Sequence, residues 1–217
     1  MRPIRKYIPG RAFFPGGAGL FRATKDNPLP PMPHRPIMLV GHNFDSEVSY
    51  DESIVRGEES IKVATWGSLL ALLHNAEVNP DECFFTNAIM GLKPGDQGTG
   101  VSPGFRDRAF RSRCAEYLQF QIEIIKPIAV VTMGLEAFAV FHETIPHPRN
   151  PLRKPDWKSI DENNRQFADR ITLSTHSFTF AAVVHPSFRN SNVHRRSFDG
   201  HTGNVAEVEL LCRVTLE

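Results

Sequence analysis

The sequence predicts an α/β fold of three layers, in which helices flank a four-stranded parallel sheet on both sides. The main observation is that short apolar runs rich in β-branched residues alternate with segments of helical periodicity. Continuous apolar strands of this kind are typical of parallel sheets that are buried on both faces. The strands are expected at residues 37–41, 82–87, 128–132 and 180–184.

Four helices are expected around these strands. Leucines at helical spacing predict a helix at 66–76, and apolar residues that repeat every three and four positions predict a long helix at 105–126. Pro127 ends the long helix, because proline has no N–H to continue the hydrogen-bond ladder. Further helices are expected after Gly134 and at about 205–212.

The chain divides into a basic arm, residues 1–36, and a single domain, residues 37–217. The arm is rich in glycine and holds seven Lys or Arg residues, one acidic residue and eight prolines. Proline fixes φ and removes a donor, so little regular structure is expected there. The arm either contacts a polyanion or lies over the domain as a solvated tail. Residues 145–170 are polar and rich in Pro and Asn, which predicts a long irregular excursion.

Composition and charge exclude several classes of protein. Apolar residues make up 41% and charged residues 23% of the 217-residue chain, which excludes a disordered chain and a coiled coil. A net charge of +1 excludes binding driven by bulk positive charge. Three scattered cysteines predict neither a disulfide framework nor a four-thiolate metal site, so we expect a reducing, cytoplasmic setting without a metal. No apolar run approaches the roughly 20 residues that span a bilayer, and no signal peptide is visible, so no membrane partner is expected.

The loops after the four strands are where a ligand is expected, because open parallel sheets bind ligands beyond the carboxyl ends of their strands. These loops lie at 41–45, 87–95, 133–134 and 185–190. Asn87 either reads a planar edge, such as that of a base, or occupies a turn or helix cap. His185 either is a turn residue or donates a hydrogen bond, as neutral imidazole, to a developing anion.

The motifs in these loops occur in a recognisable order. Gly-x-Asn follows the first strand at 41–43, Thr-Asn ends the second at 86–87, Gly134 follows the third, and His-Pro-Ser follows the fourth at 185–187. This order resembles the uracil-DNA glycosylase superfamily, whose fold agrees with the strands predicted above. The resemblance covers about residues 37–200, apart from the excursion.

Two longer stretches carry the resemblance further. Residues 84–90 and 114–134 are similar to the central part of the bacterial and archaeal members. Residues 184–190, Val-His-Pro-Ser-Phe-Arg-Asn, resemble the His-Pro-Ser-Pro-Arg-Asn loop of the single-strand-selective monofunctional branch. Cys114 resembles one cluster ligand of the iron–sulfur branches, but their N-terminal cysteine pair is missing, so we expect no cluster and a buried helix residue.

The resemblance assigns the first loop, Gly41, His42, Asn43, Phe44 and Asp45, to the positioning of the attacking water and the binding of the base. Asn43 matches the asparagine that orients this water in some branches. Phe44 replaces the usual proline, and Asp45 replaces a glycine or tyrosine. Asp45 therefore either supplies a carboxylate or caps the next helix.

The resemblance also assigns roles in the other loops. Asn87 matches the residue that reads the uracil edge, and His185 matches the histidine that hydrogen-bonds uracil O2. Arg189 matches the wedge that fills the gap left by the flipped nucleotide. Trp66 lies near the position where an aromatic ring stacks on the base, and core packing is the alternative.

Contacts with the DNA backbone are expected from loops near the mouth of the sheet, since arginine forks suit phosphate. The residues expected there are Ser102, Arg106, Gly134, Ser187, Phe188 and Arg189, with Arg195 and Arg196 nearby. The arginines of the long helix, at 108, 111 and 113, either join them or solvate a helix face.

The resemblance therefore implies a monofunctional DNA glycosylase that hydrolyses the N-glycosidic bond of uracil or a related deaminated base in DNA repair. It implies no cofactor, a monomer, and two partners: DNA that contains a damaged or deaminated base, and the free base. A non-catalytic nucleotide or nucleic-acid binding protein of the same fold is the alternative, because the first motif departs from the family. An unrelated α/β hydrolase that uses Asp45 and His185 is less favoured, because the sequence has no Gly-x-Ser-x-Gly elbow. A metal hydrolase is less favoured as well, because no His-x-x-x-His pair lies on a predicted helix.

Overall fold

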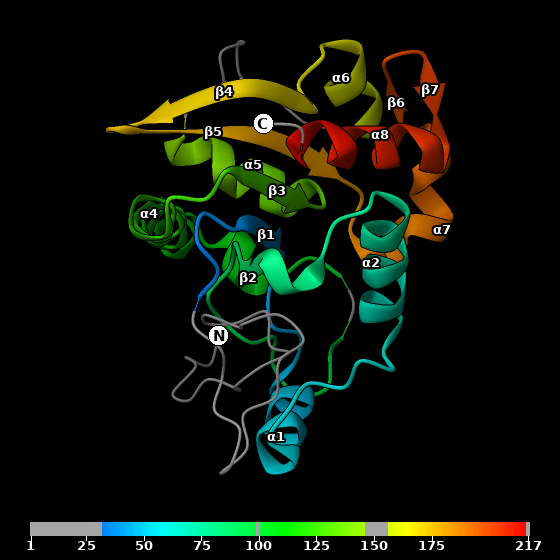
Figure 1. The fold of residues 1–217 in the computed structure, drawn as a ribbon. Helices are drawn as coiled ribbons and strands as arrows, with labels where there is room; N and C mark the ends of the chain where they lie inside the picture. Colours follow the sequence, from blue (N-terminus) through cyan, green and yellow to red (C-terminus); the bar gives the residue numbers. More distant parts are fainter. Residues whose placement is uncertain (1–31, 99, 146–155, 216–217) are drawn as a thin grey trace.

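A mostly parallel sheet of five strands forms the centre of the molecule in the computed structural model, which describes residues 32–98, 100–145 and 156–215 (Figure 1). The strand order is β2-β1-β3-β5-β4. The strands are β1 (Ile37–Gly41), β2 (Cys83–Asn87), β3 (Ala129–Met133), β4 (Phe167–Leu173) and β5 (His176–Val183). β1, β2, β3 and β5 are parallel to one another, so the expected α/β fold with four parallel strands is confirmed.

The fifth strand, β4, corrects the interpretation of residues 145–170 as an irregular excursion. β4 pairs antiparallel with β5 at the edge of the sheet, with a bulge between Ala168 and Ile171. Only some of its side chains reach the core while the others face solvent, so it lacks the continuous apolar run of the other strands. Residues 146–155 and most of the basic arm, 1–31, lie outside the described residues.

The helices in chain order are α1 (Glu47–Arg56), α2 (Ala64–Asn75), α3 (Pro103–Arg106), α4 (Arg108–Ile125), α5 (Leu135–Thr144), α6 (Trp157–Glu162), α7 (Arg189–Asn192) and α8 (Gly203–Thr215). A short hairpin, β6 (Ser197–Phe198) and β7 (His201–Thr202), precedes α8. The helix expected at 105–126 is interrupted at Asp107, whose side chain accepts a hydrogen bond from the backbone N–H of Phe110 at 3.0 Å and so caps α4.

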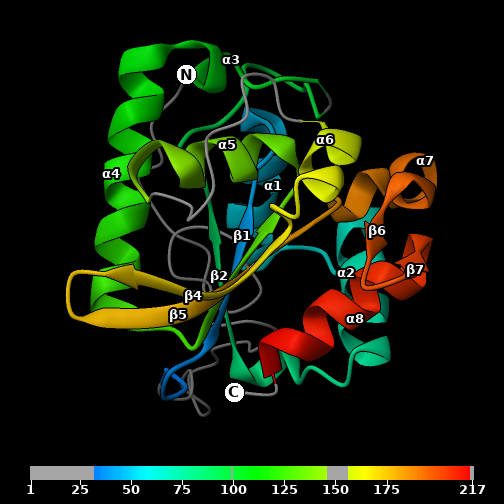
Figure 2. The same cartoon turned by 90° about the horizontal axis from the view of Figure 1, so that it is seen from above.

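Each of the four parallel strands sends alternate side chains into two separate cores. In β1, Met38 and Val40 join the core beneath α4, α5 and α6. Ile37 and Leu39 join the core beneath α2 and α8. Figure 2 shows α4 and α5 on one side of the sheet and α2 and α8 on the other. Both faces are thus covered, which explains why β1, β2 and β3 are buried along their whole length.

The carboxyl ends of the parallel strands meet at one edge of the sheet. Gly41 lies beside Asn87 in the pairing of β1 with β2. The ladder continues beyond the strands, because the N–H of Ile89 donates to the carbonyl of His42 at 2.8 Å. These bonds fix the first two loops next to each other. Among the helices of the described ranges, none is both long and apolar enough to cross a membrane.

Candidate functional site

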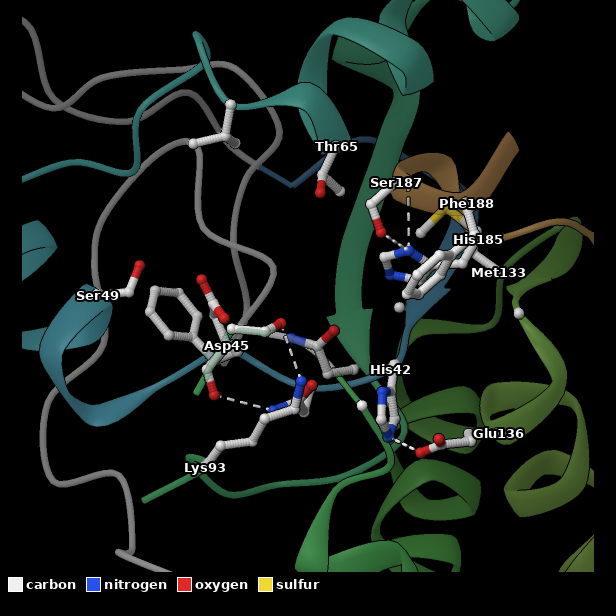
Figure 3. Close-up of a pocket in the computed structure, with 18 of the residues that line it drawn as sticks. His42, Asp45, Ser49, Thr65, Lys93, Met133, Glu136, His185, Ser187 and Phe188 are labelled. Carbon is white, nitrogen blue, oxygen red and sulfur yellow. Dashed lines mark hydrogen bonds and ion pairs between the residues drawn. The ribbon is translucent and has the colours of Figure 1, made fainter. Parts of the chain in front are cut away.

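A cavity of about 530 Å³ opens at this edge of the sheet (Figure 3). It lies within the range of roughly 300–1,000 Å³ that is usual for small-molecule sites. Asn43, Asn87 and His185, which follow or end three different strands, all line it. The expected convergence of these three residues is confirmed, while their individual roles stay predictions.

His185 lies two residues beyond β5, and the hydrogen bonds to its ring define its tautomer. Nδ1 accepts from the backbone N–H of Ser187 at 3.4 Å and lies 2.8 Å from the Ser187 Oγ. Burial, and then the positive charge of Lys93, lower the pKa of His185 to about 4. The imidazole is therefore neutral at pH 7, and because Nδ1 is an acceptor, its proton is on Nε2. This is the form that donates a hydrogen bond without carrying a charge.

Gly134 packs closely against His185. Its backbone has φ +96°, a conformation that residues with a Cβ atom rarely adopt. A Cβ at this position would lie 3.1 Å from the Cβ of His185. The N–H of Gly134 also donates to the carbonyl of Val183 at 2.8 Å. Gly134 is therefore required by the close approach of two loops, and it lines the cavity as well.

Asn87 is the last residue of β2, and only 1% of its surface is exposed. Its side chain lines the cavity. Among the described residues, its amide nitrogen Nδ2 is buried and has no hydrogen-bond partner. A buried donor without a partner costs about 1–3 kcal/mol, so its presence at the cavity wall indicates a ligand that accepts a hydrogen bond there.

The loop after β1 holds Asn43 and Asp45 by its own backbone. The Asn43 amide donates to the carbonyl of Asp45 at 3.0 Å, and Asp45 has φ +75°. Ser46, and not Asp45, caps α1, since its Oγ accepts from the backbone N–H of Ser49. The helix-capping interpretation of Asp45 is therefore wrong. Partial burial raises the pKa of its carboxyl, although Ser49 and Lys93 oppose this shift.

Two aromatic residues expected to bind the base differ in outcome. Phe44 lines the cavity, and its buried ring packs edge-on against Tyr50 at a centroid distance of 5.1 Å. Trp66 is 0% exposed and packs on Phe85 in the core beneath α2. The proposed stacking role of Trp66 is therefore wrong, and core packing is its role.

His42 and Glu136 form a second polar pair in the cavity. His42 Nε2 contacts Glu136 Oε2. Burial lowers the pKa of His42 to about 3, helped by His185 and Lys93. Burial raises the pKa of Glu136 to about 7, against the opposing effects of Lys93, the Ser102 N–H and Arg106. These shifts disfavour an ion pair of imidazolium and carboxylate. The imidazole stays neutral, and the Glu136 carboxyl group holds a proton only below about pH 7.

Lys93 and Glu136 are the two functional-site residues that the sequence analysis did not name. Lys93 is nearly buried, lines the cavity and donates from Nζ to the carbonyl of Gly98 at 3.0 Å. Burial lowers its pKa, and the carboxyl groups of Asp45 and Glu136 partly restore it. Lys93 follows β2 and Glu136 follows β3, so the rule that ligands bind beyond strand ends was the signal that could have found both.

Arg189 does not reach the cavity mouth, which contradicts its expected role as the wedge. It is 8% exposed, and its guanidinium pairs with Glu207 and donates to Asn204 Oδ1 at 2.8 Å. Arg196, also expected near DNA, is buried and pairs with Glu207 and Asp161. Burial raises the pKa of Glu207, although Arg196 and Arg189 oppose this. This buried network ties the His185 loop to α8, because Glu207 also accepts from the N–H of Val184 at 2.6 Å.

The residues expected to contact DNA differ in their exposure to solvent. Phe188 is 49% exposed, and its ring centroid lies 5.9 Å from that of His185. Ser187 and Arg106 are also exposed. Ser102, in contrast, is fully buried, and its Oγ accepts from the N–H of Gly104, so it caps α3 and does not offer its hydroxyl to DNA.

The cysteine of the long helix and the arrangement of metal-ligating side chains complete the description of the site. Cys114 is a buried residue of α4, as expected, and its Sγ accepts from the N–H of Met90 at 3.4 Å. Within residues 32–98, 100–145 and 156–215, no group of three or more His, Cys, Asp or Glu side chains is arranged to hold a metal ion.

The fold and the cavity together define an α/β protein with a small-molecule pocket at the carboxyl edge of its sheet, lined by amide and imidazole groups. The model of the uracil DNA glycosylase superfamily matches residues 36–202, so the chain belongs to this superfamily. A comparison with curated proteins found no match. Family membership supports a glycosylase-like function in DNA repair in general.

Proposed function

We propose that the protein hydrolyses the N-glycosidic bond of uracil, or of a related deaminated base, in DNA. The observation that carries this proposal is the convergence of Asn43, Asn87 and His185 in one cavity. A base in a duplex is reached only after its nucleotide is flipped out of the stack, at a cost of a few kcal/mol. The pocket offers hydrogen bonds to the flipped base that offset part of this cost.

His185 is proposed to stabilise the departing base. As the C–N bond breaks, negative charge develops on the ring and its carbonyl oxygens. A neutral imidazole with its proton on Nε2 supports this role, because it donates to an oxygen that becomes anionic. Lys93, whose charge already affects His185, adds a favourable potential on the same side.

Asn87 is proposed to identify the base. Its amide offers one acceptor and the unpartnered Nδ2 donor to the edge of the ring. Uracil presents an N–H beside a carbonyl, which is the complementary pattern. A base with an amino group in place of that carbonyl leaves the donor unpaired, so the site discriminates against it.

Asn43 is proposed to orient the attacking water, and Asp45 places a carboxyl group in the same loop. Both residues line the cavity. An amide orients water but is a poor proton acceptor, and loss of a general base lowers a rate by roughly 10²–10⁴-fold. The departures at Phe44 and Asp45 therefore predict slow chemistry unless another group accepts the proton.

Phe188 is proposed as the residue that occupies the gap in the DNA, in place of Arg189. It adjoins His185 and is half exposed, whereas Arg189 is buried. Apolar side chains commonly act as wedges between base steps. Ser187 and the exposed Arg106 are proposed to contact the backbone on either side, and Gly134 allows the close approach of the loops.

Single-turnover cleavage of synthetic DNA tests the proposed function. Single-stranded and duplex oligonucleotides with one uracil, hypoxanthine or xanthine are incubated with excess protein, and abasic sites are converted to breaks and counted. The expected result is an abasic site from at least one substrate, with release of the free base. Tight binding of the modified DNA without any abasic product would instead support the non-catalytic binding protein.

A further inference from the structure

The His42–Glu136 pair occupies the cavity beside the residues of the proposed function, but Glu136 has no part in that function. His42 is the first residue after β1, and Glu136 lies in the first turn of α5. Figure 3 shows the imidazole with Nε2 directed at the Glu136 carboxyl, and both residues line the cavity that holds Asn43. The contact through Nε2 leaves Nδ1 for another partner.

We propose that His42 takes the proton from the hydrolytic water and passes its own Nε2 proton to Glu136. The proposal rests on the proposed glycosylase function and names its missing general base. A carboxylate that holds a histidine in the correct tautomer is a general way to prepare it as a base. Here burial disfavours imidazolium at His42, so the proton passes on to the carboxyl group. In this arrangement His42 is the catalytic residue, and Glu136 is the group that acts through it.

The proton balance of the step closes within the pair. In the active state Glu136 is a carboxylate, and His42 carries its single proton on Nε2. One water proton moves to Nδ1 while the Nε2 proton moves to Glu136, and the resulting hydroxide forms the bond to the sugar C1′. The C1′–N bond breaks with its electron pair going to the base. His42 then gives its Nδ1 proton to solvent or to the released base and takes the Nε2 proton back from Glu136.

The groups around the pair favour transfer of the proton from His42 to Glu136. Glu136 faces His42, Lys93, the N–H of Ser102 and Arg106, and burial leaves its pKa at about 7. Imidazolium is strongly disfavoured at His42, which faces His185 and Lys93. The proton therefore does not stay on the ring and settles on the carboxyl group. A base with a pKa near 7 is the most effective one at neutral pH.

Asn43 and Asp45, the other polar residues of the first loop, are less suited to act as the general base. Asn43 is an amide and already donates to the carbonyl of Asp45. Asp45 is exposed, interacts with Ser49 and lies against Gly98, since its Oδ1 is 3.3 Å from the place of a Cβ on that glycine. Asp45 is therefore directed at the neighbouring loop, whereas His42 and Glu136 are enclosed in the cavity.

The dependence of the excision rate on pH tests the couple. Single-turnover rates on the best substrate are measured from pH 5 to 9 for the wild type and for Glu136→Gln, His42→Gln, Asp45→Asn and Glu143→Gln. The last is a matched control, because Glu143 also lies on α5 but pairs with Arg111. The wild-type rate is expected to rise about tenfold per pH unit below pH 7 and to level off above it.

The expected and contradicting outcomes are distinct. Glu136→Gln and His42→Gln are expected to lower the rate at pH 8 by roughly 10²–10⁴-fold, and Glu136→Gln to abolish the rise with pH. Glu143→Gln is expected to keep both the rate and the profile. A wild-type profile that survives Glu136→Gln but is lost in Asp45→Asn would overturn the proposal. An inactive wild type would instead refute the proposed function.

A measurement on the unmodified protein covers the case in which a variant does not fold. Histidine labelled with ¹⁵N reports by NMR which ring nitrogen of His42 carries the proton. The expected result is a neutral ring throughout, protonated on Nδ1 below pH 7 and on Nε2 above it as Glu136 loses its proton. A ring that becomes doubly protonated near pH 6.5 would contradict the couple.

Discussion

Arg189 and Phe188 are neighbours in the His185 loop, but the side chain of Arg189 is buried and that of Phe188 is half exposed. We therefore expect substitution of Arg189 to affect stability and substitution of Phe188 to affect DNA binding. Arg189→Met removes a guanidinium that pairs with the fully buried Glu207 and hydrogen-bonds Asn204, while it keeps most of the apolar stem. Glu207 then keeps Arg196 at 2.6 Å and the N–H of Val184 as partners.

The size of the effect follows from this partial compensation. Removing one member of a buried ion pair costs about 3–5 kcal/mol when the other charge is left alone. Because Arg196 remains beside Glu207, we expect the lower end, about 3 kcal/mol. For a domain of this size, 1 kcal/mol corresponds to roughly 2–4 °C in Tm. Arg189→Met should therefore lower Tm by about 6–12 °C.

Thermal unfolding followed by circular dichroism measures this effect, with Phe188→Ala as the matched variant. Phe188 is half exposed, so its loss should change the free energy of unfolding by no more than about 0.5 kcal/mol. Stacking on a base is worth about 1–3 kcal/mol, so Phe188→Ala should weaken binding to the modified DNA by about 5- to 150-fold. If Arg189→Met leaves Tm unchanged and weakens DNA binding instead, the side chain faces the DNA and the reasoning is wrong.

Three further predictions concern the pocket. His185→Ala should slow excision by about 10²–10³-fold in single-turnover assays, the usual effect of losing one donor to a developing anion; an unchanged rate would exclude that role. Gly134→Ala should lower the free energy of unfolding by about 1–3 kcal/mol and slow excision, because it adds a contact with His185 to the cost of a positive φ. Gly200→Ala, also at positive φ but in open space, should destabilise the protein without slowing excision. Asn87→Asp replaces the free donor with an acceptor and should weaken inhibition by free uracil by about 5- to 150-fold; equal inhibition would show that Nδ2 does not contact the base.

The pattern of apolar residues determined the α/β class and the positions of the four parallel strands, because strands buried on both faces leave a continuous apolar run in the chain. It also predicted that the loops with Asn43, Asn87 and His185 lie at one edge of the sheet, since the carboxyl ends of parallel strands share an edge. The resemblance to the superfamily selected these three residues within the loops. The antiparallel strand β4 was missed, because one face of it is exposed to solvent and its apolar residues do not form a continuous run.

Only the tertiary structure decided which polar side chains face the cavity and which are buried. Arg189 and Phe188 differ in this respect although they are adjacent, because Glu207 approaches one of them from a helix 18 positions away. Trp66 is enclosed by the core, and Glu136 meets His42 from another strand end. Sequence periodicity indicates the face of a helix or strand on which a residue lies. The partner of a charge, and hence its pKa, depends on contacts between distant segments that no local pattern encodes.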